Sequence, residues 1–150
     1  MDLWKPFSDA FDSANLLVFK TEHWSVLVRK NQVTLGTLVL AANRNFISAS
    51  ELLETELEQF PKVIGKLEFA LGKVFGYDKI NYLCLMMTDR HYHFHVIPRY
   101  ADTRQFFGSE WIDTKWPGPP NIAVSETNRE TLLAIRDELK LSLTSFKQVI

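Results

Sequence analysis

The sequence predicts a single α+β domain in which helices pack on an antiparallel sheet of about five strands. Its length of 150 residues suits one compact domain with a substantial core. Five short apolar segments have the length of strands, and two longer segments carry apolar residues at helical spacing, one of them at the C-terminal end. We find no internal repeat and no linker, so residues 1–150 are expected to form one domain.

The first three strands are predicted close together in the N-terminal third of the chain. Residues 1–14 are mixed and are interpreted as an arm or a short helix. Strands are expected at Leu16–Lys20, at Trp24–Arg29, which is rich in β-branched and aromatic residues, and from Val33 to Ala41. Lys30–Gln32 is expected to form a turn. Strands separated so briefly favour an antiparallel meander.

A long helix is predicted next. Ser48 and Glu51 have the spacing of a capping box, and Gly76 is suited to end the helix. Pro61 lies inside this segment and is expected to kink the helix or to split it in two. The apolar residues that recur at helical spacing are Phe60, Ile64, Leu67, Leu71 and Val74.

Two more strands are predicted at the apolar run Ile80–Met87 and at His91–Ile97, the second closed by Pro98. They are separated by Thr88-Asp89-Arg90 and are expected to pair. Cys84, the only cysteine, has no partner for an intrachain disulfide and is interpreted as a small buried hydrophobe.

The C-terminal part of the chain is expected to hold a loop and then a helix. Residues 101–124 are irregular, and their aromatic side chains are expected to dock on the core. Thr127 and Glu130 have capping-box spacing. The apolar stripe of the following helix is Leu132, Ile135, Leu139, Leu143 and Phe146.

Composition limits the classes of function. The chain is 46% hydrophobic and 23% charged, as in ordinary globular proteins. Its formal net charge of -1 provides no basic field for a nucleic-acid backbone, so an anionic ligand needs a local site. No apolar run approaches the roughly 18 residues of a membrane span, and the N-terminal residues lack a signal-peptide pattern. We therefore expect a cytoplasmic protein with neither nucleic acid nor membrane as its partner.

Three of the four histidines alternate within five residues. Because side chains on a strand point to alternate faces, His91, His93 and His95 are expected to project together from one face. Tyr92 and Phe94 then face the core. Three imidazoles on one face indicate a functional patch or pocket.

Two kinds of chemistry fit this patch. A metal site is one, but no Asp, Glu or Cys follows at ligand spacing, and neighbouring same-face residues are nearly 7 Å apart along a strand. Nucleophilic attack at phosphorus is the other, because a neutral imidazole is a good nucleophile near pH 7. Flanking imidazoles can then hydrogen-bond to phosphate oxygens. The second reading is favoured, and the metal reading stays as an alternative.

The segment His91-Tyr-His-Phe-His-Val-Ile97, extended by Pro98-Arg99, matches the histidine-triad pattern. Residues 76–82, 32–40 and 116–120 also resemble bacterial members described as diadenosine tetraphosphate hydrolase-like. Over roughly residues 15–120 the chain therefore resembles the histidine triad (HIT) superfamily.

The resemblance implies a HIT-like fold, often found as a homodimer, and an enzyme that requires no cofactor. It implies cleavage or transfer at the α-phosphate of a dinucleoside polyphosphate or nucleoside phosphoramidate, through a nucleotidyl-histidine intermediate. His93 would be the nucleophile, the backbone beside His91 would fix its tautomer, and His95 would contact phosphate oxygens. The base preference and the substrate itself stay open.

Further positions are assigned to substrate binding by the same resemblance. Thr88 matches a hydroxyl residue that binds phosphate, and a plain turn residue is the alternative. Arg90 and Arg99 are candidates for phosphate contacts; a solvated charge is the favoured reading for Arg90 and the alternative for Arg99. Asn31, with its neighbours Arg29 and Lys30, falls where family members contact the ribose or base. The full set of expected substrate-binding residues is Thr88, Arg90, Asn31, Thr37 and Arg99.

Two departures from the family pattern bear on catalysis. Thr37 stands where many members carry a fourth histidine, and Thr88-Asp89-Arg90 precedes the triad where a glycine-glutamine pair is common. Both departures lower the expected rate of hydrolysis more than they lower the expected affinity for a nucleotide. A non-catalytic nucleotide-binding sensor or partner protein is therefore the alternative function.

Overall fold

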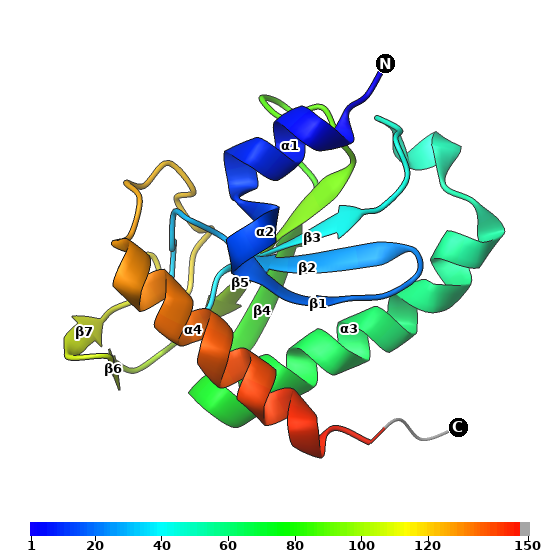
Figure 1. Cartoon of the computed structure of the whole chain (residues 1–150). Coiled ribbons are helices and arrows are strands. Elements are labelled where there is room, and N and C mark those ends of the chain that lie inside the picture. The colour runs from blue at the N-terminus through cyan, green and yellow to red at the C-terminus, as the bar shows by residue number, and fades with distance from the viewer. Residues whose placement is uncertain (148–150) are drawn as a thin grey trace.

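The computed structural model describes residues 1–147. Its centre is a five-stranded antiparallel sheet in the order β1-β2-β3-β5-β4 (Figure 1). This confirms the predicted α+β class with an antiparallel sheet. The strands of this sheet are β1 (Leu17–Lys20), β2 (Trp24–Val28), β3 (Leu38–Ala42), β4 (Lys79–Leu83) and β5 (His93–Arg99), and a separate hairpin is made of β6 (Arg104–Phe106) and β7 (Ser109–Trp111).

The helices cover the sheet on both faces. The helical elements are α1 (Trp4–Phe11), α2 (Ser13–Leu16), η1 (Ala49–Glu51), α3 (Glu54–Phe75), α4 (Arg129–Ser142) and η2 (Leu143–Ser145). Helices α3 and α4 bury their apolar stripes against Val26, Leu38 and Leu40 in the main core. Helix α1 packs through Phe7 on a smaller cluster of Leu27, Val39 and Ala41. Because strand residues alternate in direction, this smaller cluster lies on the opposite face.

The strand register places the histidines on the face that α1 covers. In the β3–β5 pair, His93 lies opposite Ala41 and His95 lies opposite Val39. Residues directly opposite each other in an antiparallel pair share a face. The two histidines therefore face α1, while Phe94 and Val96 face the main core, as the alternation predicted.

The long helix differs from its prediction at its start and at Pro61. The Ser48–Glu51 capping box is present, but it caps η1. Helix α3 begins three residues later, where the Glu56 carboxylate accepts the Leu53 backbone N–H at 2.8 Å. The helix then runs for 22 residues through Pro61, so the predicted split is wrong. The carbonyl that Pro61 leaves without a donor belongs to Leu57, a residue that is 52% exposed.

Three other local predictions are corrected. Pro98 lies inside β5, because β3 begins opposite Val96 and no strand there needs the missing N–H. Strand β4 ends at Leu83, which leaves Cys84 exposed in the following loop. The N-cap of α4 is Asn128, whose side chain accepts the Thr131 backbone N–H at 2.9 Å, and not Thr127.

The predicted C-terminal helix is confirmed in part: α4 ends at Ser142, so Leu143 lies in η2 and Phe146 follows η2, and neither belongs to the helix as predicted. Helix α4 buries Leu132, Ile135 and Leu139 as expected. Over residues 1–147, none of the helices has the length and apolar character needed to cross a membrane.

Candidate functional site

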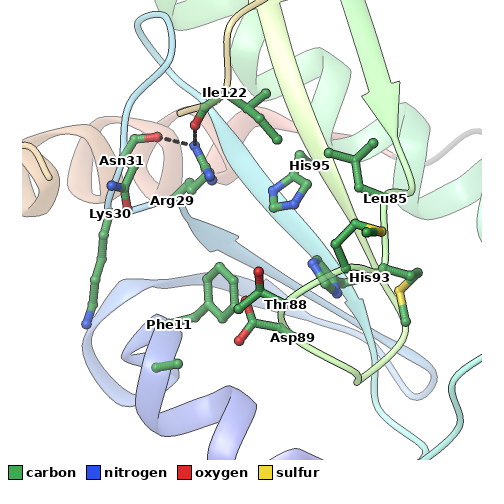
Figure 2. Close-up of a pocket in the computed structure, with 13 residues that line it drawn as sticks. Phe11, Arg29, Lys30, Asn31, Leu85, Thr88, Asp89, His93, His95 and Ile122 are labelled. Atoms are coloured by element: carbon green, nitrogen blue, oxygen red, sulfur yellow. Dashed lines mark hydrogen bonds between the residues drawn. The ribbon is translucent and has the colours of Figure 1, made fainter. Parts of the chain in front are cut away.

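His93 and His95 line a cavity of about 270 Å³ on the α1 face of the sheet (Figure 2). The walls come from five places in the chain: α1, the turn after β2, the β4–β5 loop, β5 itself and the segment after β7. The residues that line it are Ala10, Phe11, Arg29, Lys30, Asn31, Leu85, Met86, Met87, Thr88, Asp89, His93, His95 and Ile122.

His93 is held in one tautomer by the backbone. Its Nδ1–H donates to the His91 carbonyl oxygen at 2.6 Å, and a carbonyl can only accept. In the neutral ring the proton is therefore on Nδ1, and Nε2 carries a lone pair. Nε2 has no hydrogen-bond partner within residues 1–147, and the ring borders the cavity. Burial lowers the pKa of His93, which favours this neutral form.

His91 precedes the strand and has a different environment. Its Nε2–H donates to the Ala42 carbonyl oxygen, and its ring centroid lies 5.2 Å from that of Trp4 and 5.0 Å from that of Phe7. Burial lowers its pKa. His91 does not line the cavity that holds His93. Its ring fixes the local backbone, and its carbonyl oxygen orients His93.

His95 faces the same cavity as His93. The two rings meet edge to face with centroids 5.0 Å apart. Burial lowers the pKa of His95 to about 4, with a smaller contribution from the charge of Arg29. The ring is therefore neutral at pH 7. It can donate a hydrogen bond, but it has no acidic proton to transfer to a leaving group.

The end of β2 brings a cation and an amide to the cavity. Arg29 Nη1 donates to the carbonyl oxygens of Asn31 at 2.9 Å and Ile122 at 3.3 Å. Asn31 Nδ2 donates to the Val124 carbonyl oxygen at 2.6 Å. These bonds attach the segment around Ile122 to the end of β2, as Figure 2 shows for Arg29. Burial lowers the pKa of Arg29, which nevertheless stays charged at neutral pH.

Unsatisfied polar atoms gather at this site. Among the described residues, the buried side-chain nitrogens or oxygens that have no hydrogen-bond partner are Arg29 Nε, His91 Nδ1 and His95 Nδ1. Buried polar groups are normally paired, so each exception calls for an explanation. All three belong to the cavity residues or to the histidine beside them, which is consistent with a site that binds a polar ligand.

The structure brings only some of the predicted substrate-binding residues to the cavity. Thr88 and Asn31 line it. Arg90 instead lines a neighbouring pocket with His91 and the first residues of the chain. Thr37 is fully buried in the turn before β3, where its hydroxyl donates to the Thr34 carbonyl oxygen at 2.7 Å.

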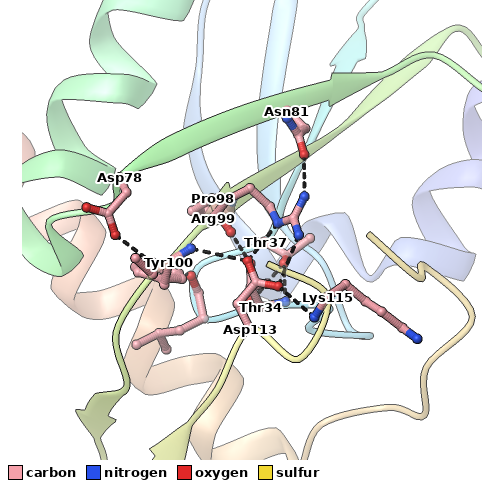
Figure 3. A network of polar contacts seen from close by, with 11 residues as sticks. Thr34, Thr37, Asp78, Asn81, Pro98, Arg99, Tyr100, Asp113 and Lys115 are labelled. Carbon is pink, nitrogen blue, oxygen red and sulfur yellow. Dashed lines mark hydrogen bonds and ion pairs between the residues drawn. The ribbon is translucent and has the colours of Figure 1, made fainter. Parts of the chain in front are cut away.

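Arg99 lies at the far end of β5 from His93 and is engaged elsewhere (Figure 3). Its Nε and Nη2 contact the two carboxylate oxygens of Asp113 at 2.7 and 3.1 Å, and Nη1 donates to Asn81 Oδ1 at 2.9 Å. Both members of this ion pair are buried. Arg99 is thus neither solvated nor free to bind a phosphate, and it anchors the segment that follows β7.

Sequence reasoning missed the contribution of the first helix. Phe11 lines the cavity, and the ring centroids of Phe7 and Phe11 lie 5.2 and 5.8 Å from that of His93. The spacing of Trp4, Phe7 and Phe11 is that of one helical face, which was the available signal. Nothing in the sequence placed that face on the histidines.

No cluster suited to a metal ion is found over residues 1–147: three or more His, Cys, Asp or Glu side chains do not converge anywhere in that range. The metal-binding reading of the three histidines gains no support from their positions, since His91 points to a different pocket from His93 and His95.

An antiparallel sheet covered by helices, with alternating histidines on one strand, is the arrangement expected of the histidine triad fold. Solved structures share it. A histidine triad protein from Marinobacter aquaeolei VT8 aligns with a TM-score of 0.69 at 18% identity over 91% of this chain and 93% of that chain. One from Sinorhizobium meliloti 1021 aligns with a TM-score of 0.69 at 17% identity over 89% and 93%.

A Zn-bound histidine triad family protein from Mycobacterium smegmatis aligns with a TM-score of 0.65 at 12% identity over 95% of this chain and 96% of that chain. No family model matches the sequence, and no curated protein matches it. The chain thus has the histidine triad fold that its motif predicted. Its assignment to the diadenosine tetraphosphate hydrolase-like subgroup stays a prediction.

Proposed function

We propose that this chain is a nucleotide-binding hydrolase or nucleotidyl transferase of the histidine triad type, which cleaves at the α-phosphate of a dinucleoside polyphosphate or nucleoside phosphoramidate. The observation that carries the proposal is the hydrogen bond from His93 Nδ1–H to the His91 carbonyl oxygen. It leaves the Nε2 lone pair of a neutral imidazole beside a cavity.

The reaction has two displacements at phosphorus. The His93 Nε2 lone pair forms an N–P bond, and the bond to the leaving group breaks with its electron pair. The leaving group takes a proton from water. The imidazole then carries positive charge, which the His91 carbonyl oxygen stabilises through the Nδ1–H bond. Water attacks the phosphorus, the N–P bond breaks, and a nucleoside monophosphate leaves. Another acceptor in place of water gives transfer.

The cavity offers groups suited to the phosphate. Arg29 has a guanidinium with an unpartnered Nε, and Thr88 has a hydroxyl, both on the cavity wall. Neutral His95 can hydrogen-bond to a phosphate oxygen. We assign Asn31, which also lines the cavity, to the nucleoside, as the resemblance implies. The proposal includes no cofactor. It includes the homodimer expected from the resemblance and the cytoplasmic location expected from the sequence.

The test is product formation by the wild type and by His93→Gln, which keeps a polar side chain of similar size. Diadenosine tetraphosphate and adenosine 5′-phosphoramidate serve as substrates, and released AMP is measured by chromatography. We expect the variant to lose at least about a thousandfold in rate, because the covalent route is removed. His23→Gln is the matched control, since His23 lies outside the cavity. Undiminished turnover by His93→Gln refutes the proposed nucleophile.

Two observations favour a second candidate, a nucleotide-binding sensor or partner protein with little catalysis. Thr37 occupies the position of a fourth histidine, and its hydroxyl donates a hydrogen bond to the Thr34 carbonyl oxygen within a turn. Burial lowers the pKa of His95 to about 4, so its ring is neutral at pH 7 and has no acidic proton to give to a leaving group. In this case calorimetry detects binding of AMP or ADP while chromatography finds no product from either substrate. Failure of the wild type to bind any nucleotide removes this candidate.

A further inference from the structure

The cavity beside His93 has two sides of opposite charge. The turn after β2 supplies Arg29 and Lys30, and the β4–β5 loop supplies Asp89. Neutral His93 and His95 form the wall between them, as Figure 2 shows. A cavity built only to hold a phosphate would carry positive charge and hydrogen-bond donors. The carboxylate of Asp89 is therefore the feature of this cavity that phosphate binding leaves unexplained.

Asp89 is not neutralised within the protein. It is only partly exposed, and over residues 1–147 its carboxylate has no hydrogen bond and no ion pair within 4.0 Å. It still acts on its surroundings, because its charge raises the pKa of Arg29 against the larger effect of burial, which lowers it. The same charge acts on His93. Asp89 and His93 line the same cavity, so a ligand whose phosphorus lies at His93 shares that cavity with the Asp89 carboxylate.

We propose that Asp89 selects substrates whose leaving group carries a positive charge, such as a nucleotide conjugate of an amine with an ammonium group. This inference rests on the proposed function and names its substrate class. The anionic phosphate lies toward Arg29, and the cationic part of the leaving group lies toward Asp89. A polyphosphate leaving group would instead bring further negative charge to an unpaired carboxylate in a partly buried site, where like charges repel more strongly than in water.

The chemical step is unchanged by this selection. Nε2 of His93 forms the bond to phosphorus, the P–N bond of the amine conjugate breaks, and the departing nitrogen keeps the electron pair and takes a proton from water. Asp89 forms no bond to phosphorus. It binds the distant ammonium group by charge, which makes it a specificity-determining residue.

Three adenosine 5′-phosphoramidates of equal chain length test the proposal, ending in an ammonium, a methyl or a carboxylate group. For the wild type we expect kcat/KM to fall about tenfold from the cationic to the neutral substrate and again to the anionic one. In Asp89→Asn both ratios should fall to about one. Asp102→Asn is the matched control, because Asp102 is exposed, lies outside the cavity and removes the same charge.

Binding measurements separate this inference from the proposed function. Calorimetry with His93→Gln, alone and combined with Asp89→Asn, gives the Kd values of the three intact conjugates without turnover. A cationic preference in Kd that Asp89→Asn removes supports the inference even if no substrate is hydrolysed. Equal Kd and kcat/KM values for the cationic and neutral conjugates overturn it, and so does an equal loss of preference in Asp102→Asn.

Discussion

Replacing Asp113 by Asn should cost about 3 kcal/mol of folding free energy. The Asp113 and Arg99 side chains are only 3% and 5% exposed. The carboxylate accepts two hydrogen bonds from the guanidinium and one each from the Tyr100 and Lys115 backbone N–H groups. In Asp113→Asn an amide NH₂ group replaces one oxygen and faces the guanidinium. Because both groups are donors, one hydrogen bond is lost and two N–H groups oppose each other. Leaving one member of a buried ion pair without its partner typically costs about 3–5 kcal/mol.

Urea denaturation of the wild type and of Asp113→Asn measures this difference, and thermal denaturation should give a midpoint lower by about 6–12 °C. Asp102→Asn, an exposed change of the same charge, should shift stability by less than about 0.5 kcal/mol. The double variant Arg99→Met/Asp113→Asn should lose little more than the larger single loss, because both remove one interaction. A loss below about 1 kcal/mol in Asp113→Asn refutes the reasoning.

The effect should depend on pH in a definite direction. Burial would raise the pKa of Asp113, but the hydrogen bonds from Arg99 and from backbone N–H groups outweigh it and hold the pKa below its ordinary value. The stabilisation is therefore present above the pKa of the unfolded carboxyl group and is lost as the pH falls through the lower folded-state pKa. The difference between wild type and Asp113→Asn should shrink over that acidic range.

Three further expectations follow from local geometry. Gly36→Ala should lower the free energy of unfolding measured in urea by about 2 kcal/mol. The φ angle of Gly36 is +88°, and a Cβ there would lie 2.9 Å from the Phe75 ring of α3. Gly65→Ala is the control and should not destabilise the protein, because the space around its Cβ is open. Asn128→Ala should cost about 1 kcal/mol as the true cap of α4, and Thr127→Ala much less; the reverse order would contradict the cap assignment. Since burial lowers the pKa of His93, kcat/KM should fall toward acid with an apparent pKa below 6.5, and a midpoint above that value would oppose a buried neutral nucleophile.

The sheet was predictable because its strands are short apolar segments of strand length, and one of them also alternates. The alternation from His91 to Val96 assigned His93 and His95 to one face, and the register of β5 on β3 confirms it. The ends of the strands were harder to predict from the sequence. The run from Ile80 to Met87 is apolar throughout, so nothing in it marked Leu83 as the last residue of β4 or predicted that Cys84 would be exposed.

The walls of the cavity were harder to predict, because they depend on contacts between distant segments. Arg29 meets Ile122, and Asn31 meets Val124, across 93 residues in each case. These are side-chain bonds to backbone carbonyls, which leave no periodic trace in a sequence. The position of Arg99 after Pro98 was equally uninformative, since its partner Asp113 lies in a segment with no regular structure.

Strand β5 connects the proposed nucleophile with the buried ion pair. At its start, the His91 carbonyl oxygen orients His93, and at its end Arg99 holds Asp113. The segment that follows Asp113 carries Ile122, which closes the cavity over Arg29. One strand therefore positions the proposed nucleophile and, through a buried ion pair at its other end, a wall of the cavity that faces it. For this reason Asp113→Asn should also weaken nucleotide binding although Asp113 does not line the cavity, and an unchanged Kd for AMP in the folded variant would separate the ion pair from the site.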